Sequence, residues 1–162
     1  MADLVNTYTE DGKVKETKER GQIDKENDIL KCVYIFVKNS KGDVFLSIIP
    51  ERAQMYVGKY GVSSAGIVRS TEDIQKAAHR TVGKEFGIRP RLQMLGTDFY
   101  NFNGLKRFIT AFCCVDDKVF PNPDDVAGGE FVPKDKIEDM LSDEEKFAPT
   151  FLALWDKYKY EL

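Results

Sequence analysis

The stretch that decides the fold is GIVRSTEDIQKAAHRTVGKEFGI, which spans residues 66–88. Apolar residues recur in it every four positions, and this spacing predicts a helix over residues 72–85 with one buried face. The predicted face consists of Ile74, Ala78, Val82 and Phe86. Ser70 or Thr71 can cap the start of the helix, and Gly87 supplies its stop, because glycine readily adopts the left-handed conformation that ends helices. The stretch therefore predicts a loop–helix–loop unit.

The same stretch also has a fixed spacing of charged residues and glycines. Gly66 is followed after five residues by Glu72, seven further residues lead to Arg80, and the segment closes with Glu85-Phe86-Gly87-Ile88. This pattern resembles the Nudix box. The resemblance implies an α/β fold, a Nudix-type α/β/α sandwich with a mixed β-sheet. It also implies structural roles for Gly66, Glu72, Arg80 and Gly87, with the glutamate and the arginine orienting the unit through a salt bridge.

The box departs from the family pattern on one face of the helix. Nudix enzymes have three glutamates there at positions i, i+3 and i+4, a spacing that places all three on one side. The matching residues here are Thr81, Lys84 and Glu85. Carboxylates hold the divalent cations that neutralise a reacting diphosphate, whereas Lys84 brings a positive charge to that position. The degenerate box is therefore better evidence for the fold than for catalysis.

Two hypotheses could restore chemistry to this face. In the first, Glu85 and Glu130 are the catalytic residues and together hold Mg²⁺ or Mn²⁺. Other acids that could supply the distal ligand are Asp116, Asp117, Asp124 and Asp125. In the second, the Lys84 ammonium replaces one cation and attracts a phosphate. Arg52 and Lys59, in the loop before the box, are predicted to bind substrate together with Lys84, by analogy with the family.

The rest of the chain predicts one domain with an N-terminal arm. Residues 1–28 are polar and form the arm, with a short hairpin around Asp11-Gly12, and residues 29–162 form the Nudix domain. Alternating or β-branched apolar runs predict strands at 31–38, 44–49, 92–102, 106–115 and 130–132. Residues 50–65 are predicted to be a loop. Helices are predicted from Pro133 to Leu141 and from Ser142 or Asp143 onward.

Two further segments resemble a particular branch of the superfamily. KCVYIFVKNSKGDVFLSI, residues 31–48, and GGEFVPKDKIEDMLSDEEKFAPTFLALWDKY, residues 128–158, resemble the branch similar to isopentenyl-diphosphate isomerase. The isomerase needs a catalytic cysteine near the loop before the box, and none of the three cysteines of this chain is close to it in sequence. The isomerase activity itself is therefore not expected.

Composition excludes several other classes of protein. The formal net charge is −3, and no basic stripe with interleaved aromatic residues is present, so we expect no nucleic-acid partner. No apolar run is long enough for a membrane span, and the polar N-terminus predicts a cytoplasmic protein. Cys32, Cys113 and Cys114 are expected to be buried small hydrophobes. One histidine, His79, rules out a site with several histidine ligands.

The sequence thus leaves two functions open. The first is a hydrolase that acts on a nucleoside diphosphate linked to another group, or on a related organic diphosphate, with a weakened or altered metal site. The alternative is a catalytically inactive Nudix domain that binds a nucleotide-like ligand or a protein partner. The resemblance also leaves a homodimer open, since many relatives pair through sheet edges or the N-terminal arm.

Overall fold

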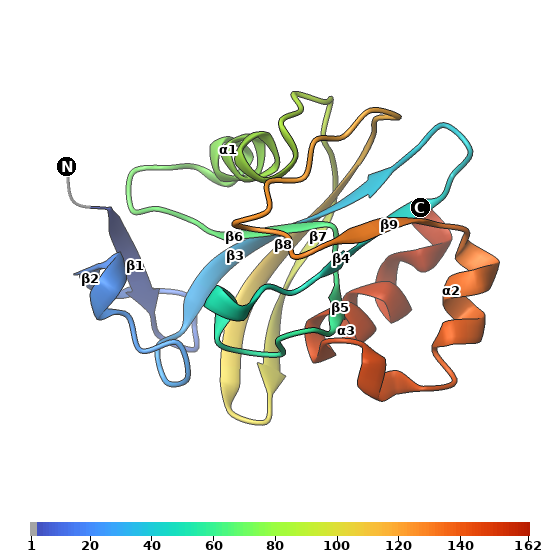
Figure 1. Ribbon diagram of the computed structural model, residues 1–162. Helices are drawn as coiled ribbons and strands as arrows, with labels where there is room; N and C mark the ends of the chain where they lie inside the picture. Colours follow the sequence, from blue (N-terminus) through green and yellow to red (C-terminus); the bar gives the residue numbers. More distant parts are fainter. Residues whose placement is uncertain (1–2) are drawn as a thin grey trace.

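The computed structural model describes residues 3–162, and its centre is a seven-stranded mixed sheet with helices on both faces (Figure 1). The strands are β1 (Leu4–Tyr8), β2 (Val14–Glu19), β3 (Leu30–Lys38), β4 (Val44–Ile48), β5 (Tyr60–Gly61), β6 (Ser64–Ile67), β7 (Gln93–Phe102), β8 (Leu105–Val115) and β9 (Gly129–Val132). The α-helices are α1 (Ile74–Phe86), α2 (Lys134–Met140) and α3 (Pro149–Tyr158). No helix among the described residues is long and apolar enough to cross a membrane.

Strand β3 is the centre of the sheet. It runs parallel to β8 along its whole length, and β7 continues the sheet antiparallel to β8. On its other side β3 pairs with β4 at Lys38 only, and β6 takes over the pairing from Cys32 to Ile35. Strand β4 diverges from β3 and carries β5 and β9 instead. This divergence places the loop between β4 and β5 beside β6 and the start of the box.

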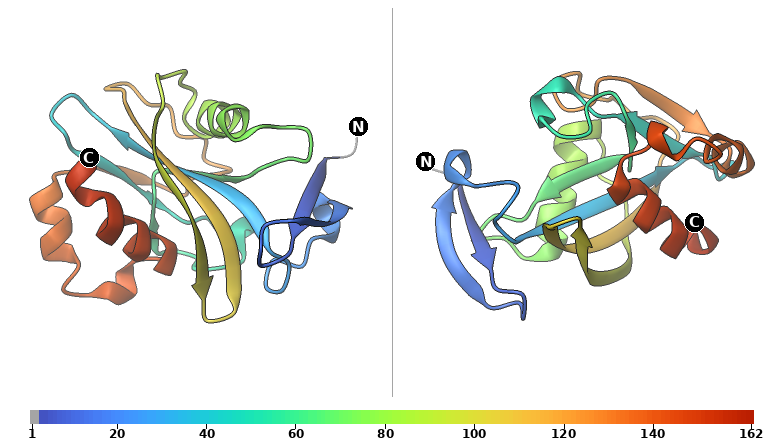
Figure 2. Two further views of the ribbon diagram at one scale, coloured as in Figure 1. Left: turned by 180° about the vertical axis from the view of Figure 1, so that it is seen from behind. Right: turned by 90° about the horizontal axis from the view of Figure 1, so that it is seen from below.

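The two faces of the sheet bury separate apolar clusters, because side chains alternate along each strand. Val33, Ile35 and Val37 of β3 pack with Val82 and Phe86 of α1. The alternate residues of β3 and β8 pack with α2 and α3 on the opposite face, and Figure 2 shows the helices on both sides. The large buried side chains on that opposite face include Phe36, Ile137, Phe147, Phe151, Leu154 and Trp155. The expected α/β/α sandwich is therefore confirmed.

Three local predictions were wrong. Residues 50–65 contain β5 and the start of β6, since pairing with β4 and β3 overrides their loop-like composition. The last helix begins at Pro149, with a short 3-10 turn at Glu144–Lys146 before it. Helix α2 begins at Lys134, and Pro133, predicted to be its first residue, is its N-cap. Cys32, Cys113 and Cys114 are free and buried, as predicted.

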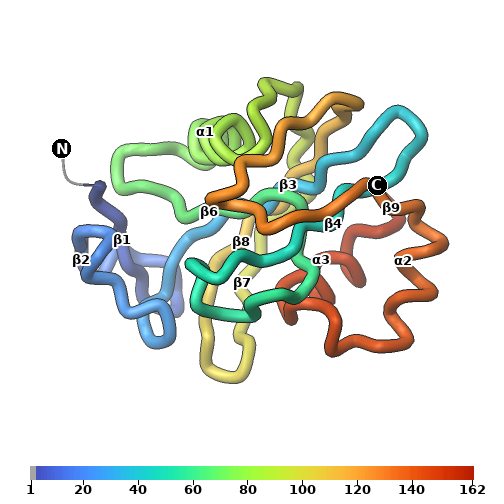
Figure 3. The backbone as a smooth tube through the Cα atoms, in the orientation of Figure 1, coloured from blue at the N-terminus to red at the C-terminus, as the bar shows by residue number. Residues whose placement is uncertain are grey.

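The N-terminal arm forms a hairpin of its own from β1 and β2, with its turn at the predicted Asp11-Gly12 position. Val5 is fully buried, and the Leu4 carbonyl accepts a 2.8 Å hydrogen bond from the Ser70 amide in the box loop. Figure 3 shows this hairpin at the opposite end of the molecule from α2 and α3. The arm is thus attached to the loop that leads into α1. The boundary at residue 28 stays a prediction.

Candidate functional site

Helix α1 carries the box, and both of its ends are capped. The Asp73 carboxylate accepts a 2.8 Å hydrogen bond from the Lys76 amide, so Asp73 is the N-cap in place of the predicted Ser70 or Thr71. At the other end Gly87 adopts a left-handed conformation with φ of 65°, as predicted. The shift of the cap to Asp73 leaves Glu72 outside the helix, where its carboxylate is free to bind other groups.

Glu72 and Arg80 form the salt bridge that the resemblance implies. Arg80 Nε lies 2.5 Å from Glu72 Oε2, Arg80 Nη2 lies 2.9 Å from Oε1, and Nη2 also donates to the Ile67 carbonyl at 2.9 Å. The Glu72 carboxylate further accepts from the Arg69 amide. Burial acts to raise the pKa of Glu72, but these hydrogen bonds outweigh it and hold that pKa below its usual value. The pair thus fixes the box loop to α1.

Gly66 and Thr81 are in direct contact at the middle of α1. A Cβ atom built on Gly66 would lie 2.4 Å from the Thr81 hydroxyl oxygen, so only glycine fits at this position. Thr81 is 2% exposed, and its hydroxyl is buried without a hydrogen-bond partner among the described residues. The side chain that replaces the first glutamate of the metal face therefore packs into the wall between β6 and α1.

Glu85 is the one acid of that face that the sequence retains, and it binds protein groups. Its Oε1 accepts from the Ser64 hydroxyl at 2.7 Å and from the Ala65 amide at 3.1 Å. The pKa of Glu85 is raised to about 7, chiefly by burial and also by the neighbouring Asp125 carboxylate, against the opposing effect of these hydrogen bonds and Lys84. The carboxyl group ties α1 to β6.

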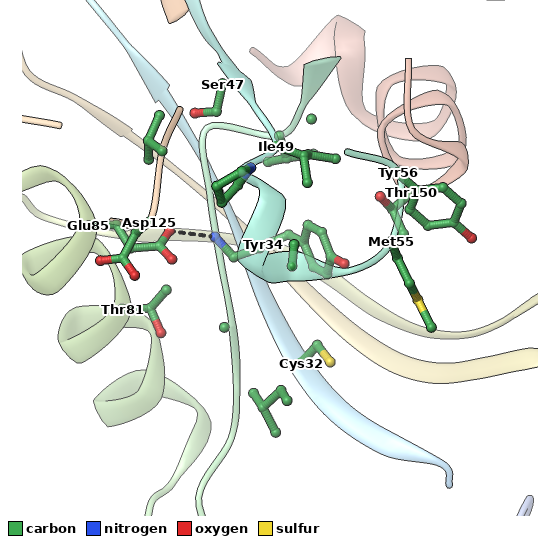
Figure 4. Close-up of a pocket in the computed structure, with 18 of the residues that line it drawn as sticks. Cys32, Tyr34, Ser47, Ile49, Met55, Tyr56, Thr81, Glu85, Asp125 and Thr150 are labelled. Atoms are coloured by element: carbon green, nitrogen blue, oxygen red, sulfur yellow. Dashed lines mark hydrogen bonds between the residues drawn. The ribbon is translucent and has the colours of Figure 1, made fainter. Parts of the chain in front are cut away.

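Lys84 is occupied by a different acid. Its Nζ lies 3.4 Å from Asp125 Oδ1, and Nη2 of Arg52 lies 3.8 Å from the same oxygen. The side chain of Asp125 is only 5% exposed, and its Oδ2 has no hydrogen-bond partner among residues 3–162. Its loop is held against α1 by the Asn122 amide, which donates to the Glu85 carbonyl at 2.8 Å. Figure 4 shows the Glu85 and Asp125 carboxylates next to each other, with Thr81 nearby.

These groups do not fit the multi-metal cluster of the family. Of the three box positions, only Glu85 offers an anionic oxygen, and the cation at Lys84 already faces the nearest additional acid, Asp125. Within the described residues, no group of three or more histidine, cysteine, aspartate or glutamate side chains is placed to hold a metal ion. The side chains on this face therefore lack the set of acids that a metal cluster needs.

A cavity of about 410 Å³ extends from this face across the end of the sheet. Cys32 and Tyr34 of β3 lie between the Glu85 side of the cavity and the Met55–Tyr56 side, as Figure 4 shows. Burial raises the pKa of the Cys32 thiol to about 11 and raises the pKa of Tyr34 above its usual value. Seven basic residues line the cavity: Arg20, Lys25, Arg52, Arg69, Arg80, Lys84 and Arg107. Its acidic residues are Glu85 and Asp125.

The structure brings together some of the predicted site residues and separates others. Arg52, Lys84 and Glu85 line the cavity. Lys59 does not; its carbonyl accepts from the Ile49 amide at the base of the loop, just beyond the β4–β5 ladder. His79 is exposed on α1.

Glu130 is also outside the cavity, which removes the predicted pairing with Glu85. It is exposed and lies opposite Leu46 in the β4–β9 ladder. Leu46 belongs to the cluster on the α2–α3 face, and directly paired residues of antiparallel strands point to the same face. Glu130 therefore points away from α1, which carries Glu85. Asp125, weighed in the sequence only as one of several loop acids, is the acid that reaches Glu85.

Sequence reasoning missed the cationic residues at the other end of the cavity. Arg20 and Lys25 belong to the arm, which looked like a solvated polar segment, and Arg107 lies within the apolar strand β8. The sequence signal that could have identified Arg107 is its position within an apolar strand, since arginine is rarely buried without a partner.

Comparison with known proteins agrees with this architecture. Residues 29–154 match the sequence profile of the NUDIX domain. The chain belongs to the Nudix family. No curated protein sequence matches this Nudix chain significantly.

Solved structures of other Nudix proteins share its fold. The crystal structure of DR0079 from Deinococcus radiodurans has a TM-score of 0.80 at 19% identity, covering 96% of this chain and 98% of that one. The MutT protein from Methanosarcina mazei Go1 has a TM-score of 0.68 at 21% identity, with 84% and 96% covered. The NUDIX domain of Shewanella oneidensis NrtR, complexed with ADP ribose, has a TM-score of 0.62 at 13% identity, with 89% and 93% covered. Identities this low establish the fold alone.

Proposed function

We propose that this Nudix domain binds a nucleotide-like organic diphosphate in its cation-lined cavity without the metal cluster of the family. The observation that carries the proposal is the ion pair between Lys84 and Asp125, which occupies the face where metal-binding glutamates would stand. Thr81, packed against Gly66, removes a second acid from that face. In this proposal, the positive charge that attracts the diphosphate comes from protein side chains and not from bound metal ions.

The charge of the cavity supports an anionic ligand. Seven basic and two acidic residues line it, although the whole chain has 24 basic and 27 acidic residues. Such a local excess attracts anions and raises their concentration at the site. The exposed Lys84 and Arg52 share one carboxylate, so a diphosphate that approaches them meets two cations and one anion. The apolar walls at Tyr34 and Met55 suit the organic part of such a ligand.

The test is isothermal titration calorimetry with ADP-ribose, ADP and inorganic pyrophosphate, in EDTA and again with Mg²⁺ or Mn²⁺. ADP-ribose is a rational probe because the structurally similar NrtR domain is complexed with it. We expect binding in EDTA, and a Lys84→Gln variant should bind on the order of tenfold more weakly. Lys76→Gln, at an exposed position of the same helix, is the matched control and should bind as the parent does. Binding that appears only with metal would contradict the proposal.

The second candidate function is hydrolysis of the same class of ligand with Mg²⁺ or Mn²⁺. It is favoured by the retained Glu85 and by the adjacent Asp125, whose Oδ2 has no partner among the described residues. A phosphate-release assay with Mn²⁺ separates the two candidates. Turnover by the parent that is lost in Glu85→Gln would establish the hydrolase. No turnover by the parent, but turnover by a Thr81→Glu/Lys84→Glu double variant, would establish the binding module.

Within the superfamily, we place the chain in the branch similar to isopentenyl-diphosphate isomerase, on the basis of residues 31–48 and 128–158. We also propose a cytoplasmic protein without nucleic-acid or membrane partners, and a homodimer that analytical ultracentrifugation would detect. These assignments rest on composition and on the resemblance.

A further inference from the structure

The end of the cavity opposite α1 carries a buried positive charge that no carboxylate neutralises. Arg107 of β8 is 7% exposed. Its Nη1 donates to the Asp28 carbonyl at 3.0 Å and to the Lys106 carbonyl at 2.8 Å, and its Nη2 donates to the Lys25 carbonyl at 2.5 Å. Among residues 3–162, Arg107 forms no ion pair. Arginine is rarely buried in this way unless it is paired.

The basic residues at the α1 end differ, because each has a carboxylate. Arg80 is paired with Glu72, and Lys84 and Arg52 share Asp125. The uncompensated charge of the cavity is therefore concentrated at the end formed by the arm and β8.

Arg107 has donors to spare for a ligand. A guanidinium has five N–H groups, and three of them are used by the carbonyls of Asp28, Lys106 and Lys25. The other two N–H groups have no protein acceptor among residues 3–162, and the side chain lines the cavity. Carbonyl groups fix the guanidinium in place but do not cancel its charge, so it is preorganised to bind an anion.

Two more cations line the same end. Arg20 and Lys25 of the arm both face the cavity, and Lys25 forms no ion pair among the described residues. The Asp3 carboxylate that lies 3.6 Å from Arg20 is shared with Arg69. Cys32 lines the cavity together with Arg20 and Arg107, and both guanidinium charges act to lower the pKa of its thiol, against the larger effect of burial.

We infer a second anion-binding subsite at this end of the cavity, formed by Arg107 with Lys25 and Arg20. It would bind a phosphate or carboxylate group at the end of the ligand remote from the diphosphate. The identity of the ligand as an organic diphosphate rests on the proposed function, whereas the subsite itself requires only an anionic group. A ligand with anionic groups at both ends and an apolar middle would match the charge distribution of the cavity.

The test is a titration of the ¹⁵N-labelled full chain with inorganic phosphate and then pyrophosphate in EDTA, followed by NMR. We expect saturable shifts of the Arg107 Nε–H signal and of the amides of residues 25–28. Arg107→Gln should weaken the phosphate affinity at these signals on the order of tenfold. Lys25→Gln, an exposed change that spares the backbone contacts, should weaken it by about threefold. Lys41→Gln, in the exposed β3–β4 turn, is the matched control and should change nothing.

The outcomes separate this inference from the proposed function. Shifts confined to the amides around Lys84 and Glu85 would contradict the second subsite and would support the proposed diphosphate site. Shifts confined to Arg107 and residues 25–28 would support the subsite and contradict the diphosphate site. If Arg107→Gln does not fold, the test rests on Lys25→Gln and on the parent protein. A phosphate affinity that Lys25→Gln leaves unchanged, together with no shift of the parent's Arg107 Nε–H signal on phosphate addition, overturns the inference. Arg107 would then serve only to hold the arm against β8.

Discussion

Replacing Glu85 by glutamine should stabilise the protein, and the gain should grow as the pH rises. Burial raises the pKa of Glu85 from 4.5 to about 7 in the folded state. The folded chain therefore holds this proton more tightly than the unfolded chain. The associated stability is fully present below pH 4.5, is lost progressively as the pH rises through 7, and is absent above that.

The magnitude follows from the size of the shift. One pKa unit corresponds to about 1.4 kcal/mol, so the full shift costs the folded state about 3 kcal/mol above pH 7. Between about pH 5 and pH 8 the parent should lose about 2 kcal/mol of unfolding free energy through this group. Glutamine cannot ionise, and its oxygen can still accept from the Ser64 hydroxyl and the Ala65 amide that Glu85 now binds. Glu85→Gln should therefore remove this decrease in unfolding free energy at high pH.

Urea denaturation at pH 5, 6, 7 and 8 measures the effect, with fluorescence of Trp155 as the probe. Trp155 is the one tryptophan of the chain and is 2% exposed, so its emission reports global unfolding. The difference in unfolding free energy between variant and parent at each pH removes the contributions of the other titrating groups, which both proteins share. Glu130→Gln, at an exposed acid on β9, is the control and should show no such trend.

Two results would refute this reasoning. A stability difference that is the same at pH 5 and pH 8 would mean that the Glu85 pKa is not raised. If the variant is less stable than the parent at pH 8, then Lys84 and the hydrogen bonds from Ser64 and Ala65 stabilise the ionised Glu85 carboxylate. In that case Glu85 would be an anion at neutral pH, and the second candidate function would gain support.

Further substitutions test the other contacts of the box. Gly66→Ala should cost about 2 kcal/mol by urea denaturation, because its Cβ would overlap the Thr81 hydroxyl, and Thr81→Ala in the same chain should recover part of the loss. Additive effects of these two changes would contradict the contact. Thr81→Val should leave stability unchanged or raise it by about 1 kcal/mol, since it removes a buried hydroxyl without a partner; a loss above that size would show that the hydroxyl is bonded. Glu72→Gln should cost about 2 kcal/mol because Arg80 loses a charged partner, and an unchanged melting curve would exclude a structural role for this pair.

The sequence predicted the parts of the fold that depend on local patterns. Helix α1 follows from its apolar spacing, and strands β7 and β8 follow from the apolar runs at 92–102 and 106–115. Strand β6 could not be predicted in the same way, because Ser64–Ile67 contains alanine and glycine, and its strand conformation comes from pairing with β3. The start of α3 was missed because the 3-10 turn at Glu144–Lys146 resembles helix in sequence.

The candidate site was predictable only where it lies on the box. Thr81, Lys84 and Glu85 follow from spacing on one helix. Asp125 does not, because its position depends on a loop that is bonded to the end of α1 through the Asn122 amide. Arg107 was missed for a related reason, since its role depends on the arm folding back over β8, where the Asp28 and Lys25 carbonyls meet its guanidinium.

The contacts of Thr81, Lys84 and Asp125 argue that the altered box is a consistent arrangement and not a damaged metal site. A lysine beside Glu85 would be unfavourable if the face still held cations, but here it neutralises Asp125, whose side chain is 5% exposed. Replacing Lys84 by glutamate alone would leave Asp125 near Glu85 with less positive charge to balance them. Restoring the family's acids would therefore add negative charge beside Asp125, where Lys84 now supplies positive charge. This difference supports the proposed metal-independent binding site.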